Sequence, residues 1–409
     1  MPDIGIIGSG IAGLHLGLFL RQHDIPVTIY SDRTPEDIGA SRLPNSVAHH
    51  RSTLERERAL GVEHWDPQEY GYFANHHHVN GPTPLEFRGD LRGPARALDY
   101  RIYLPRLIAD FQERGGTFDI RAVKPETIVS LSEQHDLIVV AAGKGEIAGM
   151  FPRRADRSPY ETPQRRLCVG LYHGVSYPDP KGMSLSVSPG HGELLELPLH
   201  SFEGPVTALL FEGIPGGDLE QVSGMDQASD PTGFEKTVLE KLESHFPQVR
   251  ERADAARFHL TRPEDLLQGG LTPVVREDYT RLPNGRFALA LGDMHTVLDP
   301  LVGQGANSAS YSAWVTGETI LEELTLDERF CQKVARRRAD RTLSAAAFSN
   351  FMLRREAAPH LIELFSAMDG DPELAEEFVD HFNRPERIWD ILSTPQRTRA
   401  YLAGQEWRQ

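Results

Sequence analysis

The first part of the chain alternates short apolar runs with a helical pattern. Residues 3–8 (DIGIIG) and 26–32 (PVTIYSD) have the apolar runs expected of buried strands, and residues 11–22 repeat apolar positions at helical spacing. A strand, a helix and a second strand within about 30 residues predict a βαβ unit with parallel strands. The segment from Pro44 to His50 breaks the periodicity and predicts a loop. The same two patterns then predict helices at 99–114 and 303–323 and strands at 136–142 and 286–292.

The middle and the end of the chain follow different patterns. From about 165 to 215, apolar and polar positions alternate in short runs that are separated by turn residues, which predicts an antiparallel sheet. A helix is predicted at 232–247. After about residue 327 the pattern is entirely helical, with a long helix near 327–355 and shorter ones divided by Pro359, Pro372, Pro385 and Pro395.

Composition narrows the classes of protein that fit. A chain of 409 residues suits two domains, or two and a tail. A net charge of −16 argues against a nucleic-acid partner, and the apolar stretches are far shorter than the ~20 residues of a membrane span. The N-terminus has no export signal, so we expect a cytoplasmic protein.

No metal site is predicted. Cys168 and Cys331 have neither a disulfide framework nor a metal-ligand spacing. His76 and His78 would share one face of a strand, but no third ligand is apparent.

The first motif with chemical meaning is G-x-G-x-x-G at Gly8, Gly10 and Gly13. It lies between a predicted strand and a predicted helix, where Gly8 permits a tight turn, Gly10 lets the backbone approach a pyrophosphate, and Gly13 lets helix and strand pack closely. The helix N-terminus adds N–H donors. The motif therefore predicts a bound dinucleotide.

An acidic residue that binds the ribose is expected after the second strand. Strand register puts that position at Ser31, so Asp32 lies one place late. We choose Asp32, with Arg33 beside it, as the predicted ribose-side residues; the alternative for Asp32 is a surface role next to Arg33.

The second motif distinguishes FAD from NAD. Residues 291–295 (LGDMH) and 299–307 (DPLVGQGAN) closely resemble the GD motif and the following loop of the flavoprotein hydroxylase superfamily. The resemblance implies that Asp293 accepts a hydrogen bond from the ribityl chain and that Pro300 lies against the isoalloxazine ring. It also places Arg101 and Arg42 near the flavin or its phosphates, each with a surface ion pair as the alternative. The implied loop contacts to FAD come from Gly303, Gln304, Gly305 and Asn307.

One expected motif is missing. Hydroxylases of this superfamily that bind NAD(P)H carry an Asp-Gly motif in mid-chain, whereas residues 141–144 read Ala-Ala-Gly-Lys. The sequence also has no second glycine fingerprint. We therefore expect no nicotinamide site.

Several longer stretches are similar to the oxygenase component of two-component styrene monooxygenases. They are GLHLGLFLRQHD at 13–24, NSVAH at 45–49, GYF at 71–73, RALDYR at 96–101, SPGHGELLELP at 188–198, LQGG at 267–270 and NRPERIWD at 383–390. The similarity runs from residue 3 to about 395. It implies an α/β fold (α+β overall) with a Rossmann-like FAD-binding domain at 1–75, 90–150 and 280–325. A substrate-binding β-sheet domain at 76–89 and 151–279 and a helical C-terminal region at 326–409 complete the expected division.

The resemblance also implies a substrate pocket. Asn45, Val47 and His49 match the styrene-type pattern, as does Tyr72, whereas the sister group of indole monooxygenases carries Ser, Gln and Met at the first three positions. Asn75 and Ala95 depart from the styrene type, which has His and Ser there. Leu301 and Val302 are further expected pocket walls. Asn45 and His49, with Pro300, are the candidate catalytic residues, expected to orient the flavin or the peroxide rather than to transfer protons.

The implied reaction needs partners. Reduced FAD from a separate NADH-dependent flavin reductase would react with O₂ to give a C4a-hydroperoxide, which epoxidises a small aromatic alkene such as styrene. The alternatives are an indole monooxygenase, a self-contained NAD(P)H-dependent aromatic hydroxylase, and a flavin-binding sensor without turnover. A homodimer is compatible with each of them.

Overall fold

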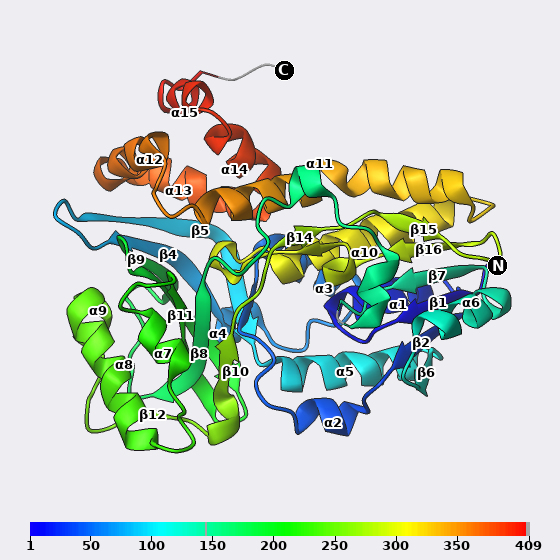
Figure 1. The fold of residues 1–409 in the computed structure, drawn as a ribbon, viewed down its shortest axis with the longest axis horizontal. Helices are drawn as coiled ribbons and strands as arrows, with labels where there is room; N and C mark the ends of the chain where they lie inside the picture. Colours follow the sequence, from blue (N-terminus) through cyan, green and yellow to red (C-terminus); the bar gives the residue numbers. More distant parts are fainter. Residues whose placement is uncertain (144, 406–409) are drawn as a thin grey trace.

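The computed structural model describes residues 1–143 and 145–405. One of its two lobes is built on a six-stranded sheet (Figure 1). The strand order is β15 (Tyr279–Arg281), β16 (Phe287–Ala290), β7 (Leu137–Val140), β1 (Ile4–Ile7), β2 (Val27–Ser31) and β6 (Thr117–Ile120). Neighbours are parallel except at the β15–β16 edge. The strands predicted at 3–8, 26–32, 136–142 and 286–292 are confirmed.

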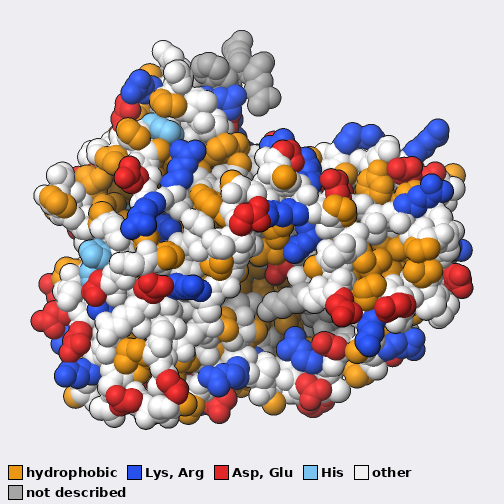
Figure 2. All heavy atoms as spheres, viewed as in Figure 1, with side chains coloured by type: hydrophobic (Ala, Val, Ile, Leu, Met, Phe, Trp, Pro, Cys, Tyr) orange, Lys and Arg blue, Asp and Glu red, His pale blue; other side chains and the backbone are white. Residues whose placement is uncertain are grey.

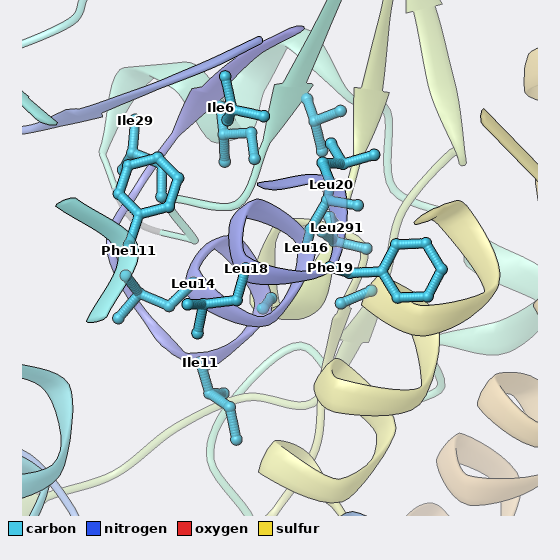
Figure 3. Close-up of a cluster of buried hydrophobic side chains, with 14 of the residues drawn as sticks. Ile6, Ile11, Leu14, Leu16, Leu18, Phe19, Leu20, Ile29, Phe111 and Leu291 are labelled. Carbon is cyan, nitrogen blue, oxygen red and sulfur yellow. The ribbon is translucent and has the colours of Figure 1, made fainter. Parts of the chain in front are cut away.

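The helices around this sheet bury its apolar faces. Helix α1 (Ile11–Gln22) lies between the sheet, α5 (Tyr100–Glu113) and α10 (Gly305–Glu322). Figure 3 shows its apolar side chains, among them Leu14, Leu16 and Leu18, gathered with Phe111 and Leu291 from other elements. Ten of its twelve residues are buried, which is why its pattern is apolar nearly all round. The other helices before residue 140 are α2 (Pro35–Gly39), α3 (Arg51–Ala59), α4 (Pro67–Tyr70) and α6 (Pro125–Gln134).

A nine-stranded sheet forms the second lobe (Figure 1). Its order is β12 (His259–Leu260), β8 (Arg166–His173), β11 (Gly204–Gly213), β10 (Gly192–Ser201), β9 (Gly182–Ser188), β4 (Gly71–Val79), β5 (Leu85–Leu98) and β3 (Val47–His49), with β13 (Leu266–Gly269) on β8. The antiparallel sheet predicted from alternation is confirmed for β8 to β11. Helices α7 (Glu220–Gly224), α8 (Pro231–His245) and α9 (Pro247–Arg250) cover its outer face, and β14 (Val274–Val275) pairs with β17 (Thr296–Val297) apart from it.

One predicted element was wrong. Residues 44–50 were predicted to be a loop, but Val47–His49 form strand β3, which pairs with β5 through Val47 and Leu98. Three residues are too few to show a period, and this strand exists because a distant partner accepts its hydrogen bonds.

Strands β4 and β5 cross the expected domain boundaries. Each runs from one assigned range into the other, at residues 75/76 and 89/90, and both belong to the nine-stranded sheet. The division of the chain into domains remains a prediction.

The end of the chain is helical, as predicted. Helix α11 (Glu328–Met352) is followed by α12 (Pro359–Gly370), α13 (Pro372–Asp380), α14 (Pro385–Leu392) and α15 (Pro395–Leu402). Each of the four prolines is the first residue of a helix, where a missing N–H costs nothing and the fixed φ suits the turn. Helices α12 and α13 contact β5, so they cover the long β4–β5 hairpin. Among the helices that the structure describes, none has the length and apolar character that a bilayer crossing requires.

Candidate active site

The glycine loop after β1 lies at the carboxyl end of the parallel sheet. Gly8 has φ +112°, and a Cβ there would lie 2.8 Å from the Ala142 nitrogen. A Cβ on Gly13 would lie 2.0 Å from the Gly8 carbonyl oxygen, so only glycine lets α1 approach β1 this closely. At Gly10, in contrast, no described atom lies within 4 Å of the Cβ position. The backbone there is open to a ligand.

The GD motif reaches the same place from the other end of the chain. Gly292 has φ +59°, and its Cβ position is 2.8 Å from the Ala12 side chain. Gly143, three residues after β7, packs against Asp293: a Cβ built on that glycine would lie 2.5 Å from the Asp293 Cβ. The last residue of the 141–144 segment lies outside the described residues. The two motifs that predicted FAD thus meet at one edge of the sheet.

The residue that faces the glycine loop from β2 is Ser31 rather than Asp32. The Ser31 hydroxyl lies 2.9 Å from the Ser9 hydroxyl and is buried. The Asp32 side chain is 73% exposed and lies 3.8 Å from the guanidinium of Arg33, which is itself half exposed. The surface alternative therefore fits Asp32 and Arg33, and we assign the position nearest the expected ribose to Ser31.

The loop at 299–307 is held by hydrogen bonds made by two of its own side chains, Asp299 and Asn307. Asp299 accepts a hydrogen bond from the Leu301 N–H at 3.1 Å and so begins the turn Pro300–Val302. Gly303 follows with φ +61°, in the left-handed region, and Gly305 begins α10 with no described atom within 4 Å of its Cβ position. The loop therefore presents open backbone just before a helix N-terminus.

Asn307 fastens this loop instead of facing a ligand. Its Nδ2 donates to the carbonyls of Ala48 and Gly303 at 2.9 and 2.8 Å. Its Oδ1 accepts from the His50 N–H at 2.9 Å and the Thr53 hydroxyl at 2.7 Å. Both donor hydrogens and both acceptor positions are used, so the predicted FAD contact of the Asn307 side chain is replaced by a structural role.

His49 is the centre of a buried network. Its Nδ1 donates to Glu57 at 2.6 Å, because a carboxylate can only accept, and its Nε2 lies 2.7 Å from the Tyr100 hydroxyl. Glu57 also accepts from Tyr103 at 2.8 Å and from Arg96. His49 is 2% exposed with both ring nitrogens engaged, so the prediction that it orients the flavin or peroxide directly was wrong. The ring links the end of β3 to Glu57 on α3 and to Tyr100 on α5.

The charges of this network are set by competition. Burial alone would raise the pKa of Glu57, but His49 and Arg96 outweigh it and hold the pKa at about 2. Burial also holds the pKa of Tyr100 and of Tyr103 well above 10. Sequence reasoning missed Glu57, because no spacing rule connects a helical glutamate to a histidine eight residues earlier across a strand end.

Three of the expected pocket residues come together. Tyr72 and Ala95 are partners in the β4–β5 register, and both belong to one apolar cluster with Leu301. All three are buried, and burial raises the pKa of the Tyr72 phenol, which therefore stays neutral. Val302 is different: it packs in the cluster under the C-terminal helices, with Phe348 and Phe351. The prediction that Val302 is a pocket wall was wrong, because adjacent residues of the turn point to opposite sides.

The remaining expected pocket residues are not members of that cluster, and Val47 packs against the core cluster that contains the α1 side chains. Val47 is half-buried at the start of β3, and Asn75 is buried on β4. Within the described residues, the amide oxygens of Asn45, Asn75 and Gln304 are buried without a hydrogen-bond partner. Buried acceptors without donors are costly, and such atoms at a site are the sign of a missing ligand.

The two arginines expected at the flavin differ in their surroundings. Arg101 is 2% exposed, and its guanidinium is paired with Asp99 and Asp265 at 2.5 Å each. We therefore no longer assign Arg101 to the cofactor site. Its ion pairs instead link α5 to the loop after β12. Arg42 is exposed and donates to the Pro263 carbonyl at 3.3 Å, which leaves most of its donors to solvent or ligand.

The site as a whole fits a flavin dinucleotide. Gly10 and Gly305 supply open backbone where a Cβ would otherwise project, and in the described part of the chain the amide oxygens of Asn45, Asn75 and Gln304 are buried without a hydrogen-bond partner. Figure 2 shows that this face of the molecule is hollowed between the two lobes. Dinucleotides bind in α/β folds at the carboxyl ends of the strands, which is where these residues meet.

Comparison with known proteins agrees with this geometry. Residues 143–252 match the family model described as "Styrene monooxygenase A putative substrate binding domain". The chain is 46% identical over 397 residues to styrene monooxygenase StyA from a Pseudomonas species, with 96% of each chain covered. The StyA protein of Pseudomonas fluorescens gives the same identity and coverage.

The fold is also similar to solved structures. The flavin-dependent brominase Bmp2 superposes with a TM-score of 0.68 at 14% identity, covering 99% of this chain and 100% of that one. At this identity the similarity establishes the fold, which confirms the predicted α/β architecture. With relatives 46% identical over 96% of its length, the chain belongs to the styrene monooxygenase family, as its oxygenase component.

Proposed function

We propose that this chain is an FAD-dependent monooxygenase that epoxidises styrene-like vinyl arenes. The observation that carries the proposal is the meeting of the glycine loop, the GD motif and the Pro300–Gly305 loop beside the apolar cluster of Tyr72, Ala95 and Leu301. Reduced FAD, when bound, would activate O₂ and supply the electrophilic oxygen atom. The relatives at 46% identity are named styrene monooxygenases, which supports the substrate class.

The chain's own residues have three tasks in this proposal. The backbone of Gly8, Gly10 and Gly305 binds the cofactor, with the α1 N-terminus facing the pyrophosphate. Asp293 holds the sugar chain. The apolar cluster excludes water and holds the vinyl group, which has no polar handle, by burial worth about 25 cal/mol per Å².

The proposed polar contacts are few. Asn45 and Asn75 each offer a buried amide oxygen that lacks a donor in the described part of the chain, so they would be able to orient a hydrogen-bonding group of the cofactor. No residue here needs to act as a strong acid or base, which fits a site whose buried histidine is already committed to Glu57.

The reducing partner is proposed to be a separate NADH-dependent flavin reductase. The sequence lacks the Asp-Gly motif and a second glycine fingerprint, which supports delivery of reduced FAD from outside.

Cys168 and Cys331 are both buried free thiols, in keeping with the cytoplasm as the proposed compartment.

The deciding experiment compares styrene and indole with one supply of reduced FAD. We expect styrene oxide as product and a kcat/KM for styrene above that for indole, although a pocket of this kind separates such substrates by only about 1–3 kcal/mol. Asn75 and Ala95 depart from the styrene-type pattern, so indole oxidation is the competing outcome. A kcat/KM for indole that exceeds that for styrene tenfold or more would assign the chain to the indole group instead.

A further inference from the structure

A row of apolar residues on the nine-stranded sheet ends in two glutamates. Leu195 and Leu197 on β10, and Ala208 and Leu210 on β11, belong to the same apolar cluster as Tyr72 and Leu301. Because side chains two apart share a face, Glu193 and Glu212 continue these two rows toward the Pro300 turn. They are direct partners in the β10–β11 register.

The glutamates meet a third carboxyl and one guanidinium. Glu212, Asp299 and Glu193 are 0%, 1% and 6% exposed, and Arg165 is 2% exposed. Of the three carboxyls, Glu193 is the one that accepts from Arg165, whose Nε and Nη2 donate to its two oxygens at 2.7 and 2.8 Å. Three carboxylates around one cation would leave two buried negative charges.

Glu212 and Asp299 are the pair without a cation of their own. Within the described residues, no N–H or O–H donor reaches the Asp299 Oδ2 or either carboxyl oxygen of Glu212. The Glu212 and Asp299 carboxyls lie close enough to shift one another's pKa, and a hydrogen bond between two carboxyls requires that one of them keeps its proton. Burial, and then the charge of Asp299, raises the pKa of Glu212 well above its ordinary value.

We propose that Glu212 is a positioning residue, which keeps its proton at neutral pH and donates it to Asp299 to hold the Pro300–Val302 turn against the sheet. Asp299 is well placed for this, because its other oxygen accepts from the Leu301 N–H at 3.1 Å and its own N–H donates to the Ser349 hydroxyl at 3.2 Å. Loss of the proton would leave two adjacent buried carboxylates, which repel one another. Only the link from this turn to catalysis rests on the proposed function.

The proton itself can be measured on the chain without FAD. A buried protonated carboxyl has an infrared C=O stretch separate from that of carboxylates, and we expect this band at pH 7 in the wild type and its loss in Glu212→Gln. The matched control is Glu196→Gln, since Glu196 is equally buried on the opposite face of β10 but binds Arg252 through both oxygens at 2.6 Å. A wild-type spectrum without the band, or a band that persists in Glu212→Gln, would overturn the proposal.

The pH dependence of stability gives a second readout. A glutamate whose folded pKa is raised stabilises the fold below its ordinary pKa, and this contribution is lost as pH rises toward the folded pKa. Between these two pKa values the folding constant of the wild type should therefore fall by up to tenfold per pH unit relative to Glu212→Gln, the effect of one proton. Arg165, Glu193 and Asp299 are unchanged in both proteins. Parallel pH profiles would contradict a proton held by Glu212.

The positioning role is tested by hydrogen exchange at the Leu301 amide. An amide side chain can donate to Asp299 as the acid does, so Glu212→Gln should keep the exchange rate within about twofold of the wild type, whereas Glu212→Leu should raise it about tenfold or more. Equal protection in Glu212→Leu would show that the pair does not hold the turn.

With reduced FAD and styrene, we expect Glu212→Leu to release several times more hydrogen peroxide per O₂ consumed than Glu212→Gln does. An unchanged ratio would overturn the link to catalysis. If the wild type forms no epoxide at all, the proposed function fails, while the infrared, stability and exchange results still decide the role of Glu212.

Discussion

Two acidic residues, Asp32 and Asp293, were both predicted to bind FAD, and the structure places them differently. Both side chains are exposed in the structure, but Asp293 lies beside Gly143 where the two motifs meet, whereas Asp32 lies beside Arg33. Only the first lies where the cofactor's sugar chain is expected. Substitution of each residue by alanine therefore separates a cofactor contact from a surface charge.

We predict that Asp293→Ala weakens FAD binding by about 1–3 kcal/mol, because the ribityl hydroxyl loses its acceptor. Asp32→Ala should change the affinity by less than about 0.5 kcal/mol, as exposed substitutions usually do. Titration of flavin fluorescence with each variant measures both. Wild-type affinity in Asp293→Ala, for oxidised and reduced FAD alike, would remove Asp293 from the site.

Glu57 carries a pH-dependent part of the stability. Its folded pKa of about 2 is below the ordinary value of 4.5, so its contribution is present above pH 4.5 and is lost as pH falls toward 2. We predict that Glu57→Gln destabilises the fold at pH 7 by about 3 kcal/mol and that the difference shrinks in acid. Denaturant unfolding of both proteins between pH 3 and about 7 checks this. A difference that does not change with pH would mean that Glu57 is not the titrating group.

The residues that sequence predicted best are those whose role is local. Gly8 and Gly13 follow from the turn and the close helix, which the six residues from Gly8 to Gly13 already specify. His49, Asn307 and Arg101 were predicted to contact the flavin, but in the structure their side chains are bound to other protein groups. Asn307 bonds to His50, 257 positions away in sequence, and Arg101 pairs with Asp265, 164 positions away. A side chain's polar partners across the fold cannot be read from its own neighbourhood.

At the scale of elements, the turn Pro300–Val302 sorts two adjacent apolar residues into different clusters. Leu301 packs with Tyr72 and Ala95 in the proposed pocket, and Val302 packs with Phe348 under the C-terminal helices. The long regular elements were predictable from period alone, since α1, α5 and α11 each repeat apolar positions over many residues. β3 and this turn were not, because three residues contain no period and their direction is set by tertiary packing.

We predict that Leu301→Ala changes substrate choice and that Val302→Ala does not. The first variant enlarges the pocket, so the ratio of kcat/KM for 2-vinylnaphthalene to that for styrene should rise severalfold. The second should keep that ratio and lose about 2 kcal/mol of stability from the cavity under the helices. Steady-state kinetics and thermal unfolding of the pair measure both effects. A changed ratio in Val302→Ala would return that residue to the pocket.

At the scale of the whole molecule, the chain has one set of dinucleotide features and no counterpart for a second nucleotide in its sequence. The open backbone at Gly10 and Gly305 serves a single ligand that spans the sheet edge. A second nucleotide would need its own set of donors. The supply of electrons is therefore expected to come from another protein.

We predict that FAD bound to this chain stays oxidised when NADH or NADPH is added without oxygen. The absorbance of the flavin should remain unchanged over minutes, whereas addition of a flavin reductase should bleach it. Dithionite reduction of the same sample is the control that shows the flavin to be reducible. Rapid bleaching by micromolar nicotinamide alone would identify a self-contained hydroxylase.

The six-stranded sheet combines strands from the first 140 residues with two strands made after residue 278, and this sets an order of events during synthesis. β1 and its glycine loop leave the ribosome first, but β16 and the GD motif are made only after the whole nine-stranded sheet. Until then one edge of β7 has no partner, and the glycine loop has no opposite wall. A nascent chain shorter than about 307 residues therefore cannot enclose the cofactor, and translation is nearly three-quarters complete before FAD can contribute to folding.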